Sequence, residues 1–388
     1  MPKVPEEWGN NFYKSGWKPG VDINDHTGQG EITHVGTDPN YNNKFDEILR
    51  QWGYDPKLYE IEGTVRSSSW QVQLKGGRTE TFFAFKGLVK KKRPGQDKYF
   101  KALFKQAGRK PPLKLKTHGG DTAFLFFMAD WQLGKKDYGV ENTIKRYDIA
   151  LQDAVNRIKE LRKTGVMINE IYMIGLGDLT ENCYGFYDSQ AFNIELTMIE
   201  QYALARSMIM KTIETFLPHA DKLTLAGVPG NHGEASRSQK GQVVTNRLDN
   251  TDTMHLQICE EIMKANPDRY KKVSVEVPDG FHQVLDIKGI TCGFSHGHMS
   301  SGSGNPENKI ENWWKGQMYG FLPAGECQIL ITGHYHHFRA KQQGDRTWFQ
   351  SPSLDKSLDF TARTGMWSHP GVLTFTVNKK GWDNLKIL

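Results

Sequence analysis

Five short polar fragments, each expected at the end of a strand, constrain what this chain can fold into more than any other feature. In chain order they are Asp130-Trp131-Gln132, Gly177-Asp178, Gly230-Asn231-His232-Gly233-Glu234, Ser295-His296-Gly297-His298 and Gly333-His334-Tyr335-His336. The apolar runs AFLFFMA, IYMIGLG and CQILIT lead into three of them and are typical of buried strands. An open α/β sheet binds its ligand outside the carboxyl ends of its strands. The sequence therefore predicts one site assembled from these five strand exits.

Strands and helices are expected to alternate from Asp121 onward. The predicted strands are 121–129, 169–176 and 222–228, and the predicted helices are 142–163, 189–217 and 239–265. A strand-rich part follows, with strands at 272–277, 282–295, 327–332, 337–340, 346–350, 371–377 and 384–388 and a helix near 307–319. This order predicts a layered α/β domain with two facing sheets over residues 118–388.

The first 89 residues predict an irregular arm over 1–40 and a small α+β module over 41–89. Phe45, Ile48, Leu49 and Trp52 have helical spacing, and Asp55-Pro56 starts a second short helix. Residues 64–74 and 79–89 alternate like strands on either side of the turn at 75–78. Helix, helix and hairpin is the outline of a winged-helix-like module, although other small α+β domains share it.

A basic linker is expected over residues 90–117. Residues 86–117 contain twelve Lys or Arg and one Asp, a net charge of +11, whereas the whole chain carries +6. Such a stretch either contacts phosphate backbones or is a solvated linker. If it binds nucleic acid, its first cations are Lys90, Lys91, Lys92 and Arg93.

Composition points to a cytoplasmic protein. The four cysteines are scattered without a C-x-x-C pair, which favours a reducing compartment over a disulfide framework. The N-terminus has no apolar stretch typical of a secretory signal, and Ala123–Ala129 is far too short to span a bilayer. We expect no membrane association, and no feature indicates an obligate protein partner.

The five fragments resemble the motifs of the calcineurin-like metallophosphoesterase superfamily, which are Asp-x-His, Gly-Asp, Gly-Asn-His-(Asp/Glu), a His-Gly and Gly-His-x-His. The resemblance covers about residues 118–360 and is nearest to the SbcD-type exonuclease and phosphodiesterase branch. Four motifs match fully; the first matches in part, because Gln132 stands where the family has His. The resemblance implies the metallophosphoesterase fold, in which helices flank two facing mixed sheets.

By that resemblance, two divalent metal ions lie between the motifs and Asp178 bridges them. The first ion would be held by Asp130, Gln132, Asp178 and His336, and the second by Asp178, Asn231, His296 and His334. A hydroxide shared by the ions would attack phosphorus. Because an amide oxygen is a harder and weaker ligand than imidazole, Gln132 favours Mn²⁺, with Mg²⁺, Fe²⁺ or Zn²⁺ as alternatives.

The remaining site residues follow from the same motifs. His232 would stay off the metals and protonate the leaving oxygen, and Glu181 would either orient His232 or be an ordinary loop acid. His298 and Arg237 would support the ligands or contact the phosphate. The basic stretch favours a phosphodiesterase or nuclease acting on DNA or RNA. The alternatives are a nucleotide or other small-molecule phosphoesterase, and a non-catalytic nucleic-acid-binding protein that retains the metallo-fold.

Overall fold

The computed structural model describes residues 13–24, 29–40, 44–73, 77–91, 117–234, 245–300, 304–356, 361–362, 365 and 367–388. The chain divides into two compact units, Met1–Pro94 and Gly95–Leu388, and each is described by itself. Within the described residues, no helix is both long and apolar enough to cross a bilayer.

The N-terminal unit is an antiparallel sheet with helix α1 packed on it. Its strands are β1 (Gly20–Asn24), β2 (Gln29–Gly36), β3 (Tyr59–Gln73) and β4 (Thr79–Lys91), in the order β1-β2-β4-β3. Helix α1 (Lys44–Gln51) buries Phe45, Ile48 and Leu49 in the core of this unit, together with Ile32 of β2.

Two expectations for this unit need correction. The irregular arm predicted over 1–40 is wrong at 20–24 and 29–36, which form the first two strands. Gly, Asn and Asp residues hide the alternation there, and Ile23 and Ile32 are its buried apolar members. The second predicted helix is a three-residue 3-10 turn, η2 (Pro56–Leu58). The described residues therefore form a sheet-based α+β module and lack the helix-helix-hairpin outline of a winged helix.

The larger sheet of the C-terminal unit has six strands in the order β15-β14-β5-β6-β7-β8. Four parallel strands form most of it: β5 (Thr122–Met128), β6 (Ile168–Gly175), β7 (Lys222–Gly227) and β8 (Val273–Glu276). The hairpin of β14 (Leu373–Asn378) and β15 (Gly381–Ile387) extends it, with β14 antiparallel to β5.

The second sheet has five strands in the order β12-β13-β11-β10-β9. Its parallel centre consists of β10 (Ile290–Ser295), β11 (Ile329–Thr332) and β13 (Arg346–Gln350). The edge strands β9 (His282–Ile287) and β12 (Arg339–Gln343) are antiparallel to their neighbours. Both sheets of this unit are therefore mixed.

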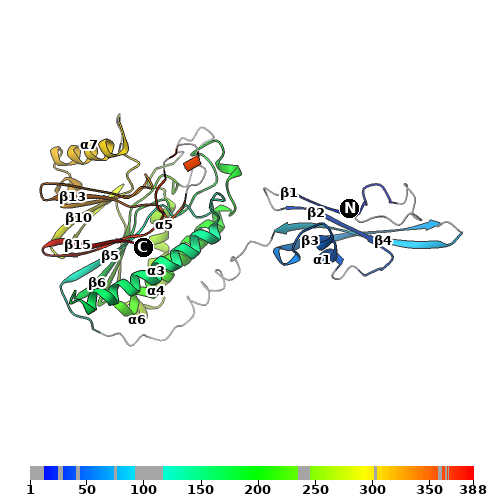
Figure 1. Ribbon diagram of the computed structural model, residues 1–388, viewed down its shortest axis with the longest axis horizontal. Helices are drawn as coiled ribbons and strands as arrows, with labels where there is room; N and C mark the ends of the chain where they lie inside the picture. Colours follow the sequence, from blue (N-terminus) through cyan, green and yellow to red (C-terminus); the bar gives the residue numbers. More distant parts are fainter. Residues whose placement is uncertain are drawn as a thin grey trace. The chain divides into compact units, whose positions relative to one another are not determined.

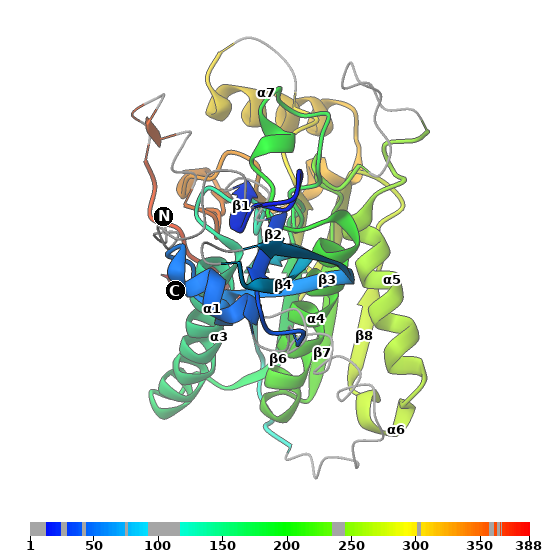
Figure 2. The ribbon, with the colours of Figure 1, turned by 90° about the vertical axis from the view of Figure 1, so that its right-hand side faces the viewer.

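The two sheets face each other, and helices cover both outer faces. Phe127 of β5 packs with Phe294 and Phe349 between the sheets, whereas Phe126 points to the helices. These helices are α3 (Val140–Lys163), α4 (Met198–Phe216) and α5 (Thr251–Lys264), which follow one another across the sheet in Figure 2. On the other face, α7 (Pro306–Tyr319) covers the second sheet, as Figure 1 shows. Trp314 of α7 and Trp348 of β13 belong to one buried apolar cluster there. The predicted layered α/β fold, two facing mixed sheets flanked by helices, is confirmed.

Element boundaries differ from the predictions at three places. Helix α4 starts only after a capping box of Thr197 and Glu200, and α5 starts after the N-cap Asn250. The strand predicted over 282–295 is a hairpin that turns at Lys288 and Gly289, both at positive φ. The short helices of this unit are η3 (Gln190–Phe192), η4 (Leu217–His219), α6 (Pro267–Tyr270) and η5 (Pro323–Glu326).

Phe127→Ala tests the contact between the sheets. The ring is 1% exposed, so its loss removes buried apolar surface and leaves a cavity, and we expect the free energy of unfolding to fall by about 3–5 kcal/mol. Denaturant unfolding followed by tryptophan fluorescence measures this change. Ile149→Ala on α3 is the control, because Ile149 is 64% exposed and its loss should change the free energy little. Equal effects of the two substitutions would contradict the described packing.

Candidate metal centre

The polar fragments meet at one edge of the paired sheets, where loops leave β5, β6, β7, β10 and β11. Main-chain bonds tie these loops together: Asp130 N donates to Gly177 O at 3.1 Å, and Gly333 N donates to His296 O at 3.1 Å. These bonds join loops of the same sheet, and His334 N, which donates to Asp130 Oδ2 at 3.1 Å, joins the five-stranded sheet to the six-stranded one. This is the arrangement that the strand exits predict.

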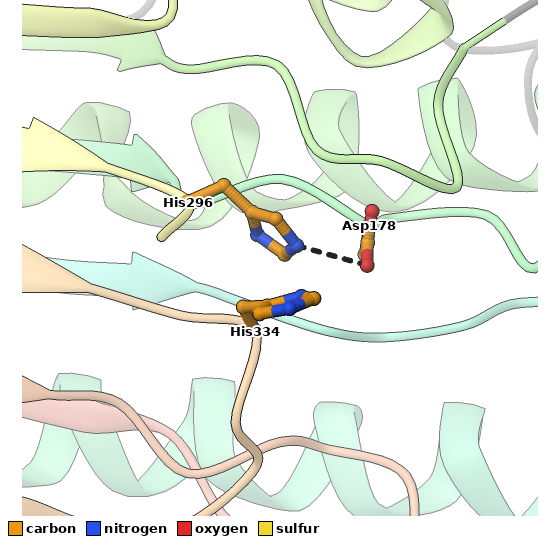
Figure 3. A group of neighbouring side chains, drawn as sticks. All are labelled: Asp178, His296 and His334. Atoms are coloured by element: carbon orange, nitrogen blue, oxygen red, sulfur yellow. Dashed lines mark ion pairs between the residues drawn. The ribbon is translucent and has the colours of Figure 1, made fainter. Parts of the chain in front are cut away.

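Three side chains at this edge are close enough to hold one metal ion. One ligand atom from each of Asp178, His296 and His334 lies within 4.8 Å of the others. Figure 3 shows these three side chains grouped together. His296 Nε2 lies 2.9 Å from Asp178 Oδ2 and 3.1 Å from Asn231 Oδ1. Carboxylate, amide and imidazole donors thus converge on one point, as expected for the second ion. His296 Nδ1 contacts Leu176 O at 2.6 Å, and this main-chain contact fixes the ring.

Charge at this point favours a cation. Burial raises the pKa of Asp178, but His296 and His232 outweigh burial and lower it, so the carboxylate is ionised. Burial lowers the pKa of His296, but Asp178 outweighs it and raises the pKa to about 9. The buried carboxylate therefore requires a positive charge beside it, which a proton on His296 or a divalent ion can supply. Burial and His296 lower the pKa of His334 to about 2, which keeps its imidazole neutral and able to act as a ligand.

The backbone adopts the left-handed conformation at five of the predicted ligands. These residues are Asp130 (φ 47°), Gln132 (φ 44°), Asp178 (φ 54°), His334 (φ 71°) and His336 (φ 60°). The conformation is uncommon for residues other than Gly, although Asn, Asp and His adopt it more readily than the rest, and it persists only where the surroundings enforce it. Five instances among the predicted ligands are an independent sign of a functional site.

Glycines allow the ligands to approach one another. A Cβ on Gly230 would lie 2.2 Å from Asp178 Oδ1, and a Cβ on Gly333 would lie 2.8 Å from Asp130 Oδ2. A Cβ on Gly177 would lie 2.7 Å from Gly230 Cα. These motif glycines therefore supply the space in which the carboxylates turn toward the histidines.

Asp252, at the start of α5, holds two of the loops together and was not predicted from the sequence. Its carboxylate accepts hydrogen bonds from Asp178 N at 3.0 Å, Leu179 N at 3.1 Å and Gly230 N at 2.9 Å. Burial and the charge of Asp178 raise its pKa to about 6. The N-cap residue Asn250 is also bound to the loops, because its Nδ2 donates to Gly230 O at 2.7 Å. The only sequence signal for Asp252 is its place after a helix N-cap, which does not identify a site.

The residues predicted for the first ion also lie together. His336 Nε2 is 3.4 Å from Asp130 Oδ1 and 3.4 Å from Gln132 Nε2. Two further residues that the sequence analysis missed contact this group. Lys135 Nζ donates to Gln132 Oε1 at 3.1 Å and to Asp355 Oδ2 at 2.8 Å. Burial lowers the pKa of Lys135, but Asp355 and Glu181 outweigh burial and raise it, so the ammonium is charged.

His232 lies beside the ligands, and its ring is held from two sides. Its backbone N donates to Asp178 Oδ1 at 2.7 Å. Nδ1 lies 2.9 Å from Glu181 O and 3.4 Å from Glu181 Oε2, and Phe186 stacks on the ring with centroids 4.2 Å apart. The Glu181 carboxylate is itself held by the Tyr187 hydroxyl, which donates to Oε1 at 2.7 Å. Glu181 thus lies where an orienting acid would be; Phe186 and Tyr187 carry no recognisable sequence signal.

The remaining predicted residues are placed as follows. The centre of the His298 ring lies 5.3 Å from that of His296 and 6.2 Å from that of His334. His298 is therefore at the margin of the residues predicted for the second ion. Arg237, Lys92 and Arg93 lie outside the described residues. Lys90 and Lys91 end strand β4, and Lys90 Nζ lies 3.1 Å from Glu62 and 3.5 Å from Glu60.

No protein-family model and no curated protein matches the chain. Solved structures similar to it include a predicted phosphoesterase from Streptococcus pneumoniae, with 10% identity over 67% of this chain and 86% of that chain and a TM-score of 0.28. An archaeal phosphodiesterase has 13% identity over 68% of this chain and 99% of that chain, with a TM-score of 0.31. Vps29 from Entamoeba histolytica, complexed with Zn²⁺, has 11% identity over 68% and 98%, with a TM-score of 0.29.

Gly230→Ala tests whether close approach is required for metal binding. The new Cβ would displace the Asp178 carboxylate, so we expect the affinity for Mn²⁺ to fall by at least about tenfold. Titration calorimetry measures the affinity, and circular dichroism checks that the fold is kept. Gly316→Ala on α7 is the matched control, since nothing lies within 4 Å of its Cβ. An unchanged affinity in Gly230→Ala would mean that the ion binds elsewhere.

Proposed function

We propose that residues 118–388 form a metal-dependent phosphoesterase of the calcineurin-like metallophosphoesterase superfamily, which hydrolyses phosphodiester bonds. The observation that carries this proposal is the convergence of Asp178, His296 and His334 within 4.8 Å, with His232 beside them. The donor set fits a divalent ion, because it combines an ionised carboxylate, an amide oxygen and imidazole nitrogens. A bound ion supplies positive charge to a phosphoryl oxygen and lowers the pKa of a water molecule.

His232 is proposed as the proton donor to the leaving oxygen. Its Nδ1 faces the main-chain carbonyl of Glu181, which leaves Nε2 as the atom that exchanges a proton with a substrate. The Glu181 carboxyl group lies 3.4 Å from the same nitrogen and would orient the ring, as the acid of a catalytic triad does. Stacking on Phe186 holds the ring in one plane. The chain thus contains an ordered acid as well as a place for the metal.

DNA or RNA is the proposed substrate, and the support for it is the +11 charge of residues 86–117. Lys90 contributes little to this support, because its ammonium already pairs with two glutamates of β3. Lys86 is paired as well, with Glu31 of β2 at 2.8 Å, so the other cations of the stretch would have to supply the phosphate contacts. A small phosphodiester is the second candidate, since none of the described donors of the metal group is specific for a polymer.

Asp178→Asn tests the proposed activity. Without the central carboxylate, Mn²⁺-dependent hydrolysis should fall by at least about a hundredfold, which equals roughly 2.7 kcal/mol of transition-state stabilisation. The substrates are DNA, RNA, a cyclic dinucleotide, bis-p-nitrophenyl phosphate and p-nitrophenyl phosphate. Asp188→Asn, on an exposed loop residue, is the matched control and should keep full activity.

The panel also separates the candidate functions. Preference for polynucleotides supports the nuclease, and preference for a small diester supports the second candidate. Polynucleotide binding without turnover under any metal would support a non-catalytic binding protein. Hydrolysis by Asp178→Asn at the wild-type rate would disprove the proposed site.

His232→Ala should slow hydrolysis in proportion to the basicity of the leaving group. General acid catalysis contributes about 10²–10⁴-fold, and an activated leaving group needs less of it. Turnover of a nucleotide ester should therefore fall much more than turnover of bis-p-nitrophenyl phosphate, while metal affinity is kept. His118→Ala is the control, because His118 precedes β5, at the end of the strand opposite to the site. Equal losses on both esters would contradict the role of His232.

A further inference from the structure

The environment of Gln132 differs from that of a metal ligand. The loop that carries it is held by main-chain bonds, since Gln132 N donates to Asp178 O at 3.0 Å and Leu133 N donates to Leu179 O at 3.2 Å. Gln132 itself is buried, with 6% of its surface exposed. The described contacts of its side-chain amide are with Lys135 on one side and His336 on the other.

Lys135 fixes which way this amide points. An ammonium group has three donors and no acceptor, so the atom 3.1 Å from Lys135 Nζ has to be the amide oxygen. The reverse orientation would place an NH₂ group against an ammonium. Asp355 holds Lys135 in place through a contact of 2.8 Å between two nearly buried groups. Consequently the amide nitrogen, Nε2, is the atom that faces His336 Nε2 at 3.4 Å.

An amide nitrogen that carries two hydrogens is not a ligand for a cation, and its positive edge repels one. Of the four residues predicted for the first ion, Asp130, Asp178 and His336 can still donate to a metal, and Gln132 cannot. The second group has no such defect, because Asn231 Oδ1 lies 3.1 Å from His296 Nε2, beside the Asp178 carboxylate. The two groups are therefore unequal in their capacity for metal.

We propose that Lys135 acts as a positioning residue that turns the Gln132 amide nitrogen into the first metal position, so that the centre binds one divalent ion tightly and not two. That ion is held by Asp178, Asn231, His296 and His334, and the N–H groups of Gln132 take the place of the other ion. This inference deepens the proposed function and rests on it for the presence of a metal. It replaces the pair of ions that the family resemblance implies.

Binding of Mn²⁺ to the full chain tests this inference, by titration calorimetry for stoichiometry and by electron paramagnetic resonance for the state of the ion. Wild type should bind one Mn²⁺ tightly and give the six-line signal of an isolated ion. Asp130→Asn should keep that affinity, whereas His296→Ala should lose it by about tenfold or more. Two tightly bound ions with an exchange-coupled signal in wild type would overturn the inference. If wild type bound no Mn²⁺ at all, the proposed metal-dependent function itself would be contradicted.

Two variants test the role of Lys135 itself. Lys135→Met combined with Asp355→Asn removes both charges of the pair, frees the amide to turn, and should let a second ion bind about tenfold or more tighter than in wild type. The coupled signal should then appear. Gln132→His keeps the Lys135–Asp355 pair, supplies an imidazole, and should also recruit the second ion if the double variant does not fold. Lys136→Met is the matched control and should behave as wild type. A folded double variant that still binds one ion would overturn the role of Lys135.

Discussion

The buried, ionised carboxylate of Asp178 is the interaction on which the site depends. It follows β6 of one sheet, and the imidazole that compensates its charge, His296, follows β10 of the other sheet. A buried carboxylate without a partner would cost several kcal/mol of folding free energy. The two sheets therefore have to hold these two loops in contact. The main chain contributes as well, because the backbone N of His232 donates to Asp178 Oδ1. The Asp178 carboxylate therefore contacts both the loop of the proposed acid His232 and the ligand His296 from the other sheet.

The residues that hold the loops of the site in place are not themselves predicted metal ligands. Asp252 and Asn250 hold the loops through main-chain hydrogen bonds, and their own place is fixed by the start of α5. The glycines of the motifs contribute by lacking a side chain. A short motif in this chain thus serves two purposes, since one residue presents a donor while its neighbour makes room for it.

The sequence alone predicts the layers and the strand exits well, because apolar runs of seven or fewer residues next to His, Asp and Asn are a local signal. Local signals fail where the decisive contact is distant. Lys135 and Asp355 are 220 residues apart, and neither stands in a motif. The hairpin between β9 and β10 was predicted as one strand, because its turn contains Lys288 at positive φ where Asn or Asp is usual. Strands β1 and β2 were missed, because polar residues interrupt their alternation.

The order of strands in the larger sheet has a consequence for how the unit is made. β5 is the first strand in the described part of this unit, yet it pairs on one side with β14, where Phe126 lies opposite Thr374. During synthesis, that edge of β5 remains without its partner until nearly all of the unit has been translated. Contacts so distant in sequence form slowly, and an open strand edge can pair with other chains. Asp130 directly follows β5, so a carboxylate encoded early reaches its final environment only when the last strands arrive.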